Sequence, residues 1–200
     1  MQRVSLSGLF AAILISQTAM ADDGPKFKKG VPTDAIRFVI NDSDDAKAST
    51  MIFDNFQVAT ATSKPAQPDI QLKTFTYVRN IESTEDACLE QDFRGYVSRD
   101  GLAGASMIVR TGGKTWVVDL DKAIKNANDD PSESEEDEED EFEGADDFLV
   151  TISTAIPKGQ SLQTTVILLV DRIQGDDESG ALLVLDTIDA EFREKSDNAE

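Results

Sequence analysis

The residues of this sequence best suited to chemistry are carboxylates, and many of them gather in one run. The segment "SESEEDEEDEFEGADD", from Ser132 to Asp147, contains no Lys or Arg. Three interpretations of this run stay open: a solvated loop, weak multi-site binding of Ca²⁺ or a mineral surface, and recruitment of a basic protein. Because the run lacks the D-x-[DN]-x-[DN]-G spacing of a calcium-binding loop, we expect any ion binding there to be diffuse.

A second group of acids surrounds the turn-like segment "DRIQGDDESG". A calcium site needs several carboxylates that converge with backbone carbonyls. A polar hairpin tip is the simpler interpretation, and it applies equally to "NDSDD" from Asn41 to Asp45. The candidate metal ligands are therefore weak ones: Asp171, Asp176, Asp177 and Glu178.

Several kinds of active site are excluded by composition. The chain has no histidine and a single cysteine, Cys88, so it can form neither a Ser-His-Asp nor a Cys-His nucleophile system, nor an ordinary zinc site. We expect Cys88 to be a small, partly buried apolar residue. The catalytic chemistry that remains is that of carboxylates, lysine or tyrosine. A glycosidase would use a pair of acids that face each other across a cleft.

The N-terminus predicts export. "MQRVSLS" carries Arg3, "GLFAAILI" is a short apolar run, and "SQTAMA" ends with the small residues Ala19 and Ala21 of a cleavage site. We therefore expect residues 1–21 to be a signal peptide, cleaved after Ala21, and the protein to be secreted or periplasmic. No segment is long and apolar enough for an integral membrane protein.

The charge of the chain narrows the choice of partner. The net charge is −20, which disfavours nucleic acid and anionic membranes because both need Lys and Arg to displace counterions. Divalent cations, basic proteins and glycans are the partners left open. The oligomeric state is not indicated by the sequence.

The remaining sequence alternates between β-like runs and turn residues, which predicts an all-β, antiparallel β-sandwich of about nine strands in a single domain, 22–200. Four reversals, at Asp100–Gly101, Gly112–Gly113, Pro157–Gln160 and Gly175–Gly180, are expected to join sequential strands as antiparallel neighbours. The expected strands are "DAIRFVI", "STMIFDNFQVAT", "DIQLKTFTYVR", "DFRGYVSR", "GASMIVR", "KTWVVDL", "DFLVTISTAI", "SLQTTVILLVDRI" and "ALLVLDTIDAEF".

Patterns within the strands predict faces and positions. Phe148, Val150, Ile152 and Ile156 share one side of their strand, and "TVILLV" and "ALLVL" are apolar on both sides, which favours central places in the sheets. Short helices are expected at "STEDACLE" and "DLDKAIKNAN". The acidic insertion, at about 127–147, has too few apolar residues to offset its ordering entropy, so we expect it to be disordered.

Three single residues stand out. We expect Arg94 to pair with a neighbouring carboxylate such as Asp92, and Gly95 to allow a close backbone approach or a bulge. The only tryptophan, Trp116, is expected to pack in the core.

Two segments carry a resemblance to a known family. "DFRGYVSRDGLAGASMIVRTGG" and "SGALLVLDTIDAEF", together with "STMIFDNFQVAT", resemble a family of secreted β-rich proteins of unknown function from fungi and some bacteria. The resemblance implies export and a β fold but no catalytic residue, and "PDIQLK" lacks the cysteine that members of the family usually carry there. We therefore expect a secreted, non-enzymatic binding or matrix-type module without a firm cofactor, with weak Ca²⁺ binding as an option. The alternative is a secreted carboxylate-dependent hydrolase.

Overall fold

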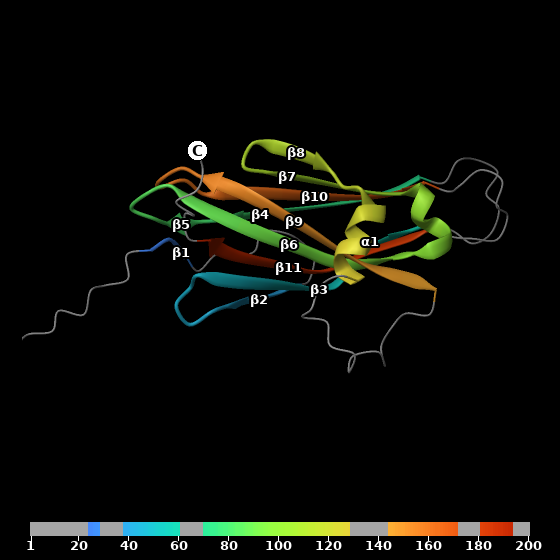
Figure 1. Ribbon diagram of the computed structural model, residues 1–200, viewed down its shortest axis with the longest axis horizontal. Coiled ribbons are helices and arrows are strands. Elements are labelled where there is room, and N and C mark those ends of the chain that lie inside the picture. The colour runs from blue at the N-terminus through green and yellow to red at the C-terminus, as the bar shows by residue number, and fades with distance from the viewer. Residues whose placement is uncertain (1–23, 29–37, 61–69, 129–143, 172–180, 194–200) are drawn as a thin grey trace, which may run out of the picture.

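The computed structural model describes residues 24–28, 38–60, 70–128, 144–171 and 181–193, and within them the chain forms two large antiparallel sheets and one two-stranded sheet. Figure 1 shows the strands of both large sheets running along the long axis of the molecule. The five-stranded sheet has the order β2 (Phe38–Asp42), β3 (Ala48–Ala59), β11 (Leu182–Arg193), β6 (Ala87–Ser98) and β9 (Ala145–Ile156). The four-stranded sheet has the order β4 (Ile70–Arg79), β10 (Leu162–Asp171), β7 (Ala105–Thr111) and β8 (Lys114–Val117).

The predicted all-β sandwich is confirmed, and each of the nine expected runs contributes one of these strands. The two runs that are apolar on both sides, β10 and β11, occupy inner positions of their sheets, as predicted. A further two-stranded sheet pairs the short strands β1 (Lys26–Phe27) and β5 (Ile81–Glu82).

One of the two helix predictions is wrong. The helix α1 (Leu120–Asn128) is present, and its first turn is capped where the Lys122 amide donates to Asp119 Oδ1 at 3.1 Å. The segment from Ser83, in contrast, makes a local turn, in which the Ser83 hydroxyl donates to the Glu85 carbonyl at 2.5 Å, and then enters β6. The period-two burial of β6 extends back to Leu89, and this packing overrides the local helix signal.

The connections differ from the predicted ones. Gly112 and Gly113, with φ of 55° and 75°, close the β7–β8 hairpin as expected. A short 3₁₀ helix, η1 (Arg99–Gly104), and the turn at 157–160 instead carry the chain from the five-stranded sheet to the four-stranded sheet. The segment 175–180 lies outside the described residues, but β10 and β11 on either side belong to different sheets. The predicted hairpin there is therefore wrong.

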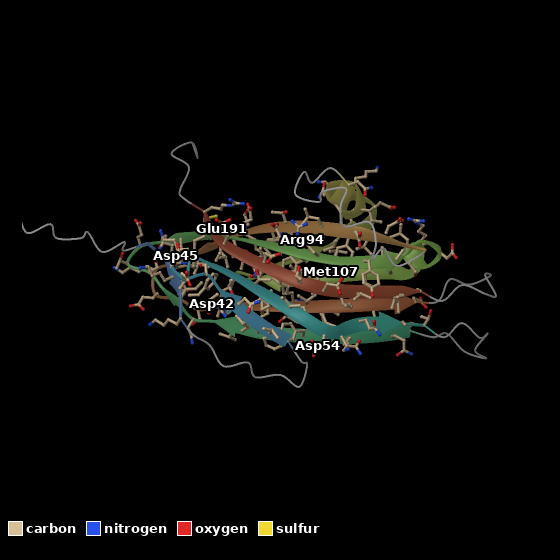
Figure 2. The ribbon with its side chains drawn as sticks, turned by 90° about the horizontal axis from the view of Figure 1, so that it is seen from below. Asp42, Asp45, Asp54, Arg94, Met107 and Glu191 are labelled. Atoms are coloured by element: carbon tan, nitrogen blue, oxygen red, sulfur yellow. The ribbon has the colours of Figure 1, made fainter. Side chains whose placement is uncertain are left out.

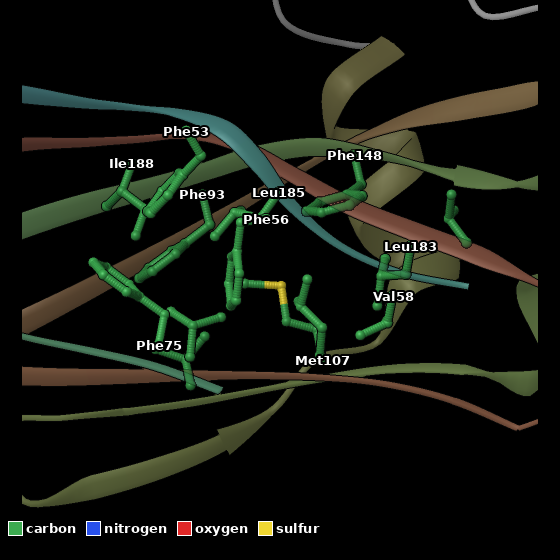
Figure 3. Close-up of a cluster of buried hydrophobic side chains, with 14 of the residues drawn as sticks. Phe53, Phe56, Val58, Phe75, Phe93, Met107, Phe148, Leu183, Leu185 and Ile188 are labelled. Atoms are coloured by element: carbon green, nitrogen blue, oxygen red, sulfur yellow. The ribbon is translucent and has the colours of Figure 1, made fainter. Parts of the chain in front are cut away.

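The core fills the space between the two sheets. Aromatic rings from both sheets meet in it: the Phe53 and Phe75 centroids lie 5.0 Å apart at 86°, and the Phe56 and Phe75 centroids lie 5.8 Å apart (Figure 3). Edge-to-face and tilted contacts of this kind are favourable beyond the area that the rings bury. Each of these three phenylalanines is at most 6% exposed.

A buried polar cluster links the sheets beside this apolar core. Gln91 of β6 is fully buried and donates from Nε2 to the Tyr77 hydroxyl of β4 at 2.5 Å. Its Oε1 accepts a hydrogen bond from the Thr111 hydroxyl of β7 at 3.1 Å, and the Thr164 hydroxyl of β10 donates to Thr111 at 2.9 Å. Burial raises the pKa of Tyr77 far above its ordinary value, so this hydroxyl stays protonated and available to the cluster.

Candidate functional site

The acids singled out in the sequence are not brought together by the described residues. Asp171 is exposed at the end of β10, while Asp176, Asp177 and Glu178 lie outside the described part of the chain. Residues 129–143 of the acidic run also lie outside the described part of the chain. The segment between α1, which ends at Asn128, and β9, which begins at Ala145, is shorter than the insertion expected at about 127–147. Among the residues that the structure describes, no three acidic or Cys side chains are grouped to hold a metal ion.

A different set of carboxylates meets on the outer face of the five-stranded sheet. In the antiparallel register of β6 and β11, Asp92 lies directly opposite Asp189, and Glu90 directly opposite Glu191. We call these four residues the acidic ladder; Glu191 and the neighbouring Arg94 are labelled in Figure 2. They point outward because the residues between them on both strands are buried in the core.

The flanking strands supply hydroxyl donors to the acidic ladder. The Thr50 hydroxyl of β3 donates to Asp189 Oδ1 at 2.5 Å, and the Thr151 hydroxyl of β9 donates to Asp92 Oδ1 at 2.6 Å. Four adjacent strands therefore hold the two central acids in place.

Two arginines offset part of the negative charge. Arg193 hydrogen-bonds Glu90, and its Nη1 lies 3.3 Å from Glu191 Oε2; these carboxylates raise the pKa of the guanidinium, with the Glu90 hydrogen bond the largest cause. Arg94 Nε lies 3.9 Å from Asp189 Oδ2. Arg94 therefore pairs with a neighbouring carboxylate, as expected, and this carboxylate lies on the adjacent strand β11, whereas the example suggested by the sequence was Asp92 on its own strand.

The prediction for Gly95 is confirmed by the strand next to it. β11 has a register shift between Leu185 and Thr187, opposite Gly95. A Cβ on Gly95 would lie 2.1 Å from the Val184 carbonyl oxygen, so only glycine fits this approach. The bulge in β11 and the missing side chain in β6 together let the two strands stay paired along the acidic ladder.

The bulge also creates a second acidic position on the same face. Burial raises the pKa of Asp186, the bulged residue, and the nearby charge of Asp147 raises it further. The pKa of Tyr96 is raised by burial and then by the same two carboxylates. Asp147 lies directly opposite Tyr96 in the register of β9 and β6.

Two hollows lie along this face. A small one of about 160 Å³ is lined by all four residues of the acidic ladder. A larger one of about 890 Å³ opens beside it, and its charged lining includes Asp45, Glu85, Glu191, Lys47 and Arg193. The free cysteine, Cys88, is half-buried in the lining of the larger hollow, in agreement with its expected partial burial.

Trp116 lies elsewhere. It is partly buried against the core, as predicted, and borders a hollow of about 220 Å³ between β8, α1 and β9. Asp119 is the single carboxylate among the described residues that line this hollow. Within the described residues, Trp116 is therefore not joined by the pair of facing acids that a glycosidase would need.

No protein-family model and no curated protein matches the chain. The resemblance to a family of secreted β-rich proteins therefore stays a prediction. None of the helices in the described part of the chain has the length and apolar character needed to cross a membrane.

The sequence contains the signal that could have predicted the outward acids of each strand in the acidic ladder. Glu90, Asp92 and Arg94 alternate with buried residues in "CLEQDFRGY", and Asp189 and Glu191 alternate in "DTIDAEF". The helix predicted at Ser83 interrupted the first of these patterns, so its acids were not assigned to one face. The pairing of β6 with β11, which joins residues about a hundred positions apart, has no local signal.

Proposed function

We propose that the protein is a secreted, non-enzymatic binding module whose acidic ladder binds a basic segment of a partner protein. The observation that carries this proposal is the pair of directly opposed carboxylates repeated in successive outward rows, Asp92 with Asp189 and Glu90 with Glu191. Like charges directly opposite each other destabilise a sheet. A cationic partner relieves this repulsion, since the two arginines beside the ladder offset only part of it.

The spacing of the ladder fits an extended basic peptide. Successive outward residues of a strand lie roughly 7 Å apart, which equals the distance between alternate side chains of a peptide in the same conformation. Lys or Arg at alternate positions of such a peptide would meet successive rows of the ladder. The net charge of −20 would also speed the approach of a basic partner.

Calcium and hydrolysis have less support. A calcium ion in a defined site needs six to eight oxygen ligands, and no group of three acidic side chains suited to a metal is found in the described residues. The hydrolase alternative needs two acids across a cleft, and the ladder lies on the outside of a sheet. Weak, diffuse Ca²⁺ binding by the acidic run stays a secondary hypothesis.

The test is calorimetric titration with an octapeptide of alternating Lys and Ser at an ionic strength of about 0.1 M, where long-range charge effects are largely screened. The ladder variant is Asp92→Asn/Asp189→Asn, and the control is Asp100→Asn/Asp121→Asn, which removes the same charge from exposed acids elsewhere. We expect the ladder variant to bind about tenfold more weakly, because the two exposed charge pairs that it removes together contribute about 1.4 kcal/mol. The control should change the affinity less than about twofold, because Asp100 and Asp121 lie in η1 and α1 and not in the ladder. Exposed charges farther apart than the Debye length, about 10 Å at 0.1 M salt, are largely screened from each other.

Two outcomes would count against the proposal. Equal weakening by both double variants would mean that the peptide responds to net charge and not to the ladder. Loss of binding when residues 129–144 are replaced by a Gly/Ser linker, with no effect of the ladder variant, would place the cationic partner on the acidic run. A parallel titration with CaCl₂ separates a basic partner from a divalent ion.

A further inference from the structure

The outer face of the four-stranded sheet is apolar. Side chains on this face alternate with buried ones along β4, β10, β7 and β8. Leu72 lies directly opposite Leu169, and Ile167 lies in one row with Ile108 and Val117. Four of the exposed side chains are more than half accessible: Ile70 at 56%, Leu72 at 60%, Val78 at 51% and Val117 at 74%. We call this surface, made by Ile70, Leu72, Ile108, Val117, Ile167 and Leu169, the apolar face.

The apolar face is almost free of charge. The other outward residues of these strands are threonine, serine, glutamine and valine, and the only charged ones are Arg110 and Asp171. The chain as a whole has a net charge of −20. Large exposed apolar patches on soluble proteins mark interaction sites, and this one lies where the repulsion between two copies of an acidic chain would be smallest.

We propose that two copies of the protein pack face to face through the apolar face. In this arrangement the acidic ladders of the two copies point in opposite directions, with four sheet layers between them. Sheets stack roughly 10 Å apart, so the ladders lie roughly 30 Å from each other. This distance exceeds the Debye length of about 8 Å at physiological ionic strength, so their mutual repulsion is largely screened.

The size of the apolar face suits a weak dimer. From the strand lengths and the usual strand spacing, the outer face of the four-stranded sheet covers roughly 500 Å² on each copy. Two copies would bury roughly 1,000 Å², near the lower limit for a specific interface. We therefore expect a dissociation constant in the micromolar range and not an obligate dimer.

The edge of the same sheet is a poorer place for association. β4 is an edge strand, and its Lys73 points inward, where Nζ donates to the Asn55 carbonyl at 2.8 Å and lies 5.7 Å from the centre of the Phe56 ring. An inward-pointing charge is a common device that discourages edge-to-edge pairing of strands. The face of the sheet, which has no such protection, is left as the surface for a second copy.

The two charged residues of this surface are arranged to complement each other across a twofold axis. Arg110 lies opposite Thr165 of β10, six residues before Asp171 on that strand, so the two charges are roughly 20 Å apart along the strands. Within the described residues, neither has a recorded ion pair. A twofold axis that crosses the strands midway, near Leu168, reverses the strand direction and brings Arg110 close to Asp171 of the partner subunit.

The first test is sedimentation velocity of the purified protein from about 1 μM to about 1 mM, a range that spans a micromolar dissociation constant. Leu72→Glu places a charge in the apolar face. Its matched control is Ile52→Glu, at a 42% exposed position on the outer face of the five-stranded sheet. We expect Leu72→Glu to raise the dissociation constant at least about tenfold, and Ile52→Glu to change it less than about threefold, because burial of a charge is costly only at the interface.

Charge exchange and salt complete the test. Arg110→Asp and Asp171→Lys should each weaken the dimer, and the combined variant should restore it. Added NaCl should strengthen the dimer, because it screens the net repulsion, whereas it should weaken binding of the basic peptide. The two proposals can therefore fail separately. A monomer at every concentration, equal effects of Leu72→Glu and Ile52→Glu, or no effect of Leu72→Glu in a variant with unchanged thermal melting would overturn the dimer.

Discussion

The outer faces of the two sheets use the same strand geometry for opposite purposes. On the five-stranded sheet, the positions that alternate with the core carry the acidic ladder, two arginines and the hydroxyls that hold them. On the four-stranded sheet, the equivalent positions carry branched apolar residues and threonine. Among the described strands, the outward acids therefore lie mainly on the five-stranded sheet, and Asp171 is the single outward acid of the four-stranded sheet.

The inner faces, in contrast, are shared. Phenylalanines from both sheets meet in one core, and Gln91 carries hydrogen bonds from the five-stranded sheet to three hydroxyls of the other. This shared interior keeps the two outer faces in a fixed relation to each other. Substitutions in the acidic sheet, in the shared interior and at a single charge should therefore lower or raise the stability of the protein by different amounts, taken below from the largest to the smallest.

The largest effect is expected from Gly95→Ala, which adds a side chain to β6 opposite the bulge of β11, on the sheet that carries the acidic ladder. The new Cβ would lie 2.1 Å from the Val184 carbonyl oxygen and 2.9 Å from Leu185 Cα, both backbone atoms that cannot rotate away. We expect the free energy of unfolding in urea to fall by about 3 kcal/mol, at the upper end for overpacking. β11 would have to move away from β6 to make room for the new Cβ, and this movement should also weaken binding of the basic peptide to the acidic ladder.

Gly113→Ala is the control for this change. Its φ of 75° strains an alanine, but nothing lies within 4 Å of its Cβ, so we expect a loss of only about 1 kcal/mol. If the two variants were equally stable, the close approach at Gly95 would not be what holds β6 and β11 in register.

The second effect concerns the interior that joins the two faces. Gln91→Leu removes the amide that donates to the buried Tyr77 hydroxyl and the acceptor of the buried Thr111 hydroxyl, which keeps only its hydrogen bond from Thr164. We expect the free energy of unfolding to fall by about 2 kcal/mol, because a buried polar group without a partner costs about 1–3 kcal/mol. Thr151→Val, which removes an exposed hydroxyl that donates to Asp92, should cost less than about 1 kcal/mol in the same urea titration. Equal losses would mean that the buried cluster does not tie the sheets together.

The two outer faces also show which features of the fold could be predicted from the sequence. Alternation placed Phe148, Ile152 and Ile156 in the core, and two-sided apolar runs placed β10 and β11 in the middle of their sheets. The same runs could not reveal that the second side of β10 is left exposed, because a local pattern does not say which element covers it. Likewise, the turn residues at 157–160 predicted a reversal but not that the chain changes sheets there.

The candidate site shows the same limit. The acids of the ladder were visible one strand at a time, but their opposition depends on the long-range pairing of β6 with β11. The dense acidic run drew attention by composition, which reports charge and says nothing of geometry. Sequence periodicity therefore predicted the strands, and only register could assemble their outward residues into a surface.

The smallest effect is expected from Asp186→Asn, which sharpens the comparison by testing one charge of the acidic side. Burial and then Asp147 raise the folded-state pKa of Asp186 above its ordinary value of 3.8. The cost of keeping this carboxylate ionised is thus fully present above the folded-state pKa and disappears as pH falls below the unfolded-state value. The asparagine variant should be more stable than the unaltered protein by up to about 1 kcal/mol at pH 7, since like-charge neighbours in a sheet cost about that much. This advantage should fade in urea titrations repeated down to about pH 3, below the ordinary pKa of the carboxyl group.

Asp100→Asn, which changes an exposed acid in η1, is the control for this prediction. Its stability difference from the unaltered protein should stay near zero across the pH range. If the difference for Asp186→Asn were equally independent of pH, burial and Asp147 would not act on the charge of Asp186.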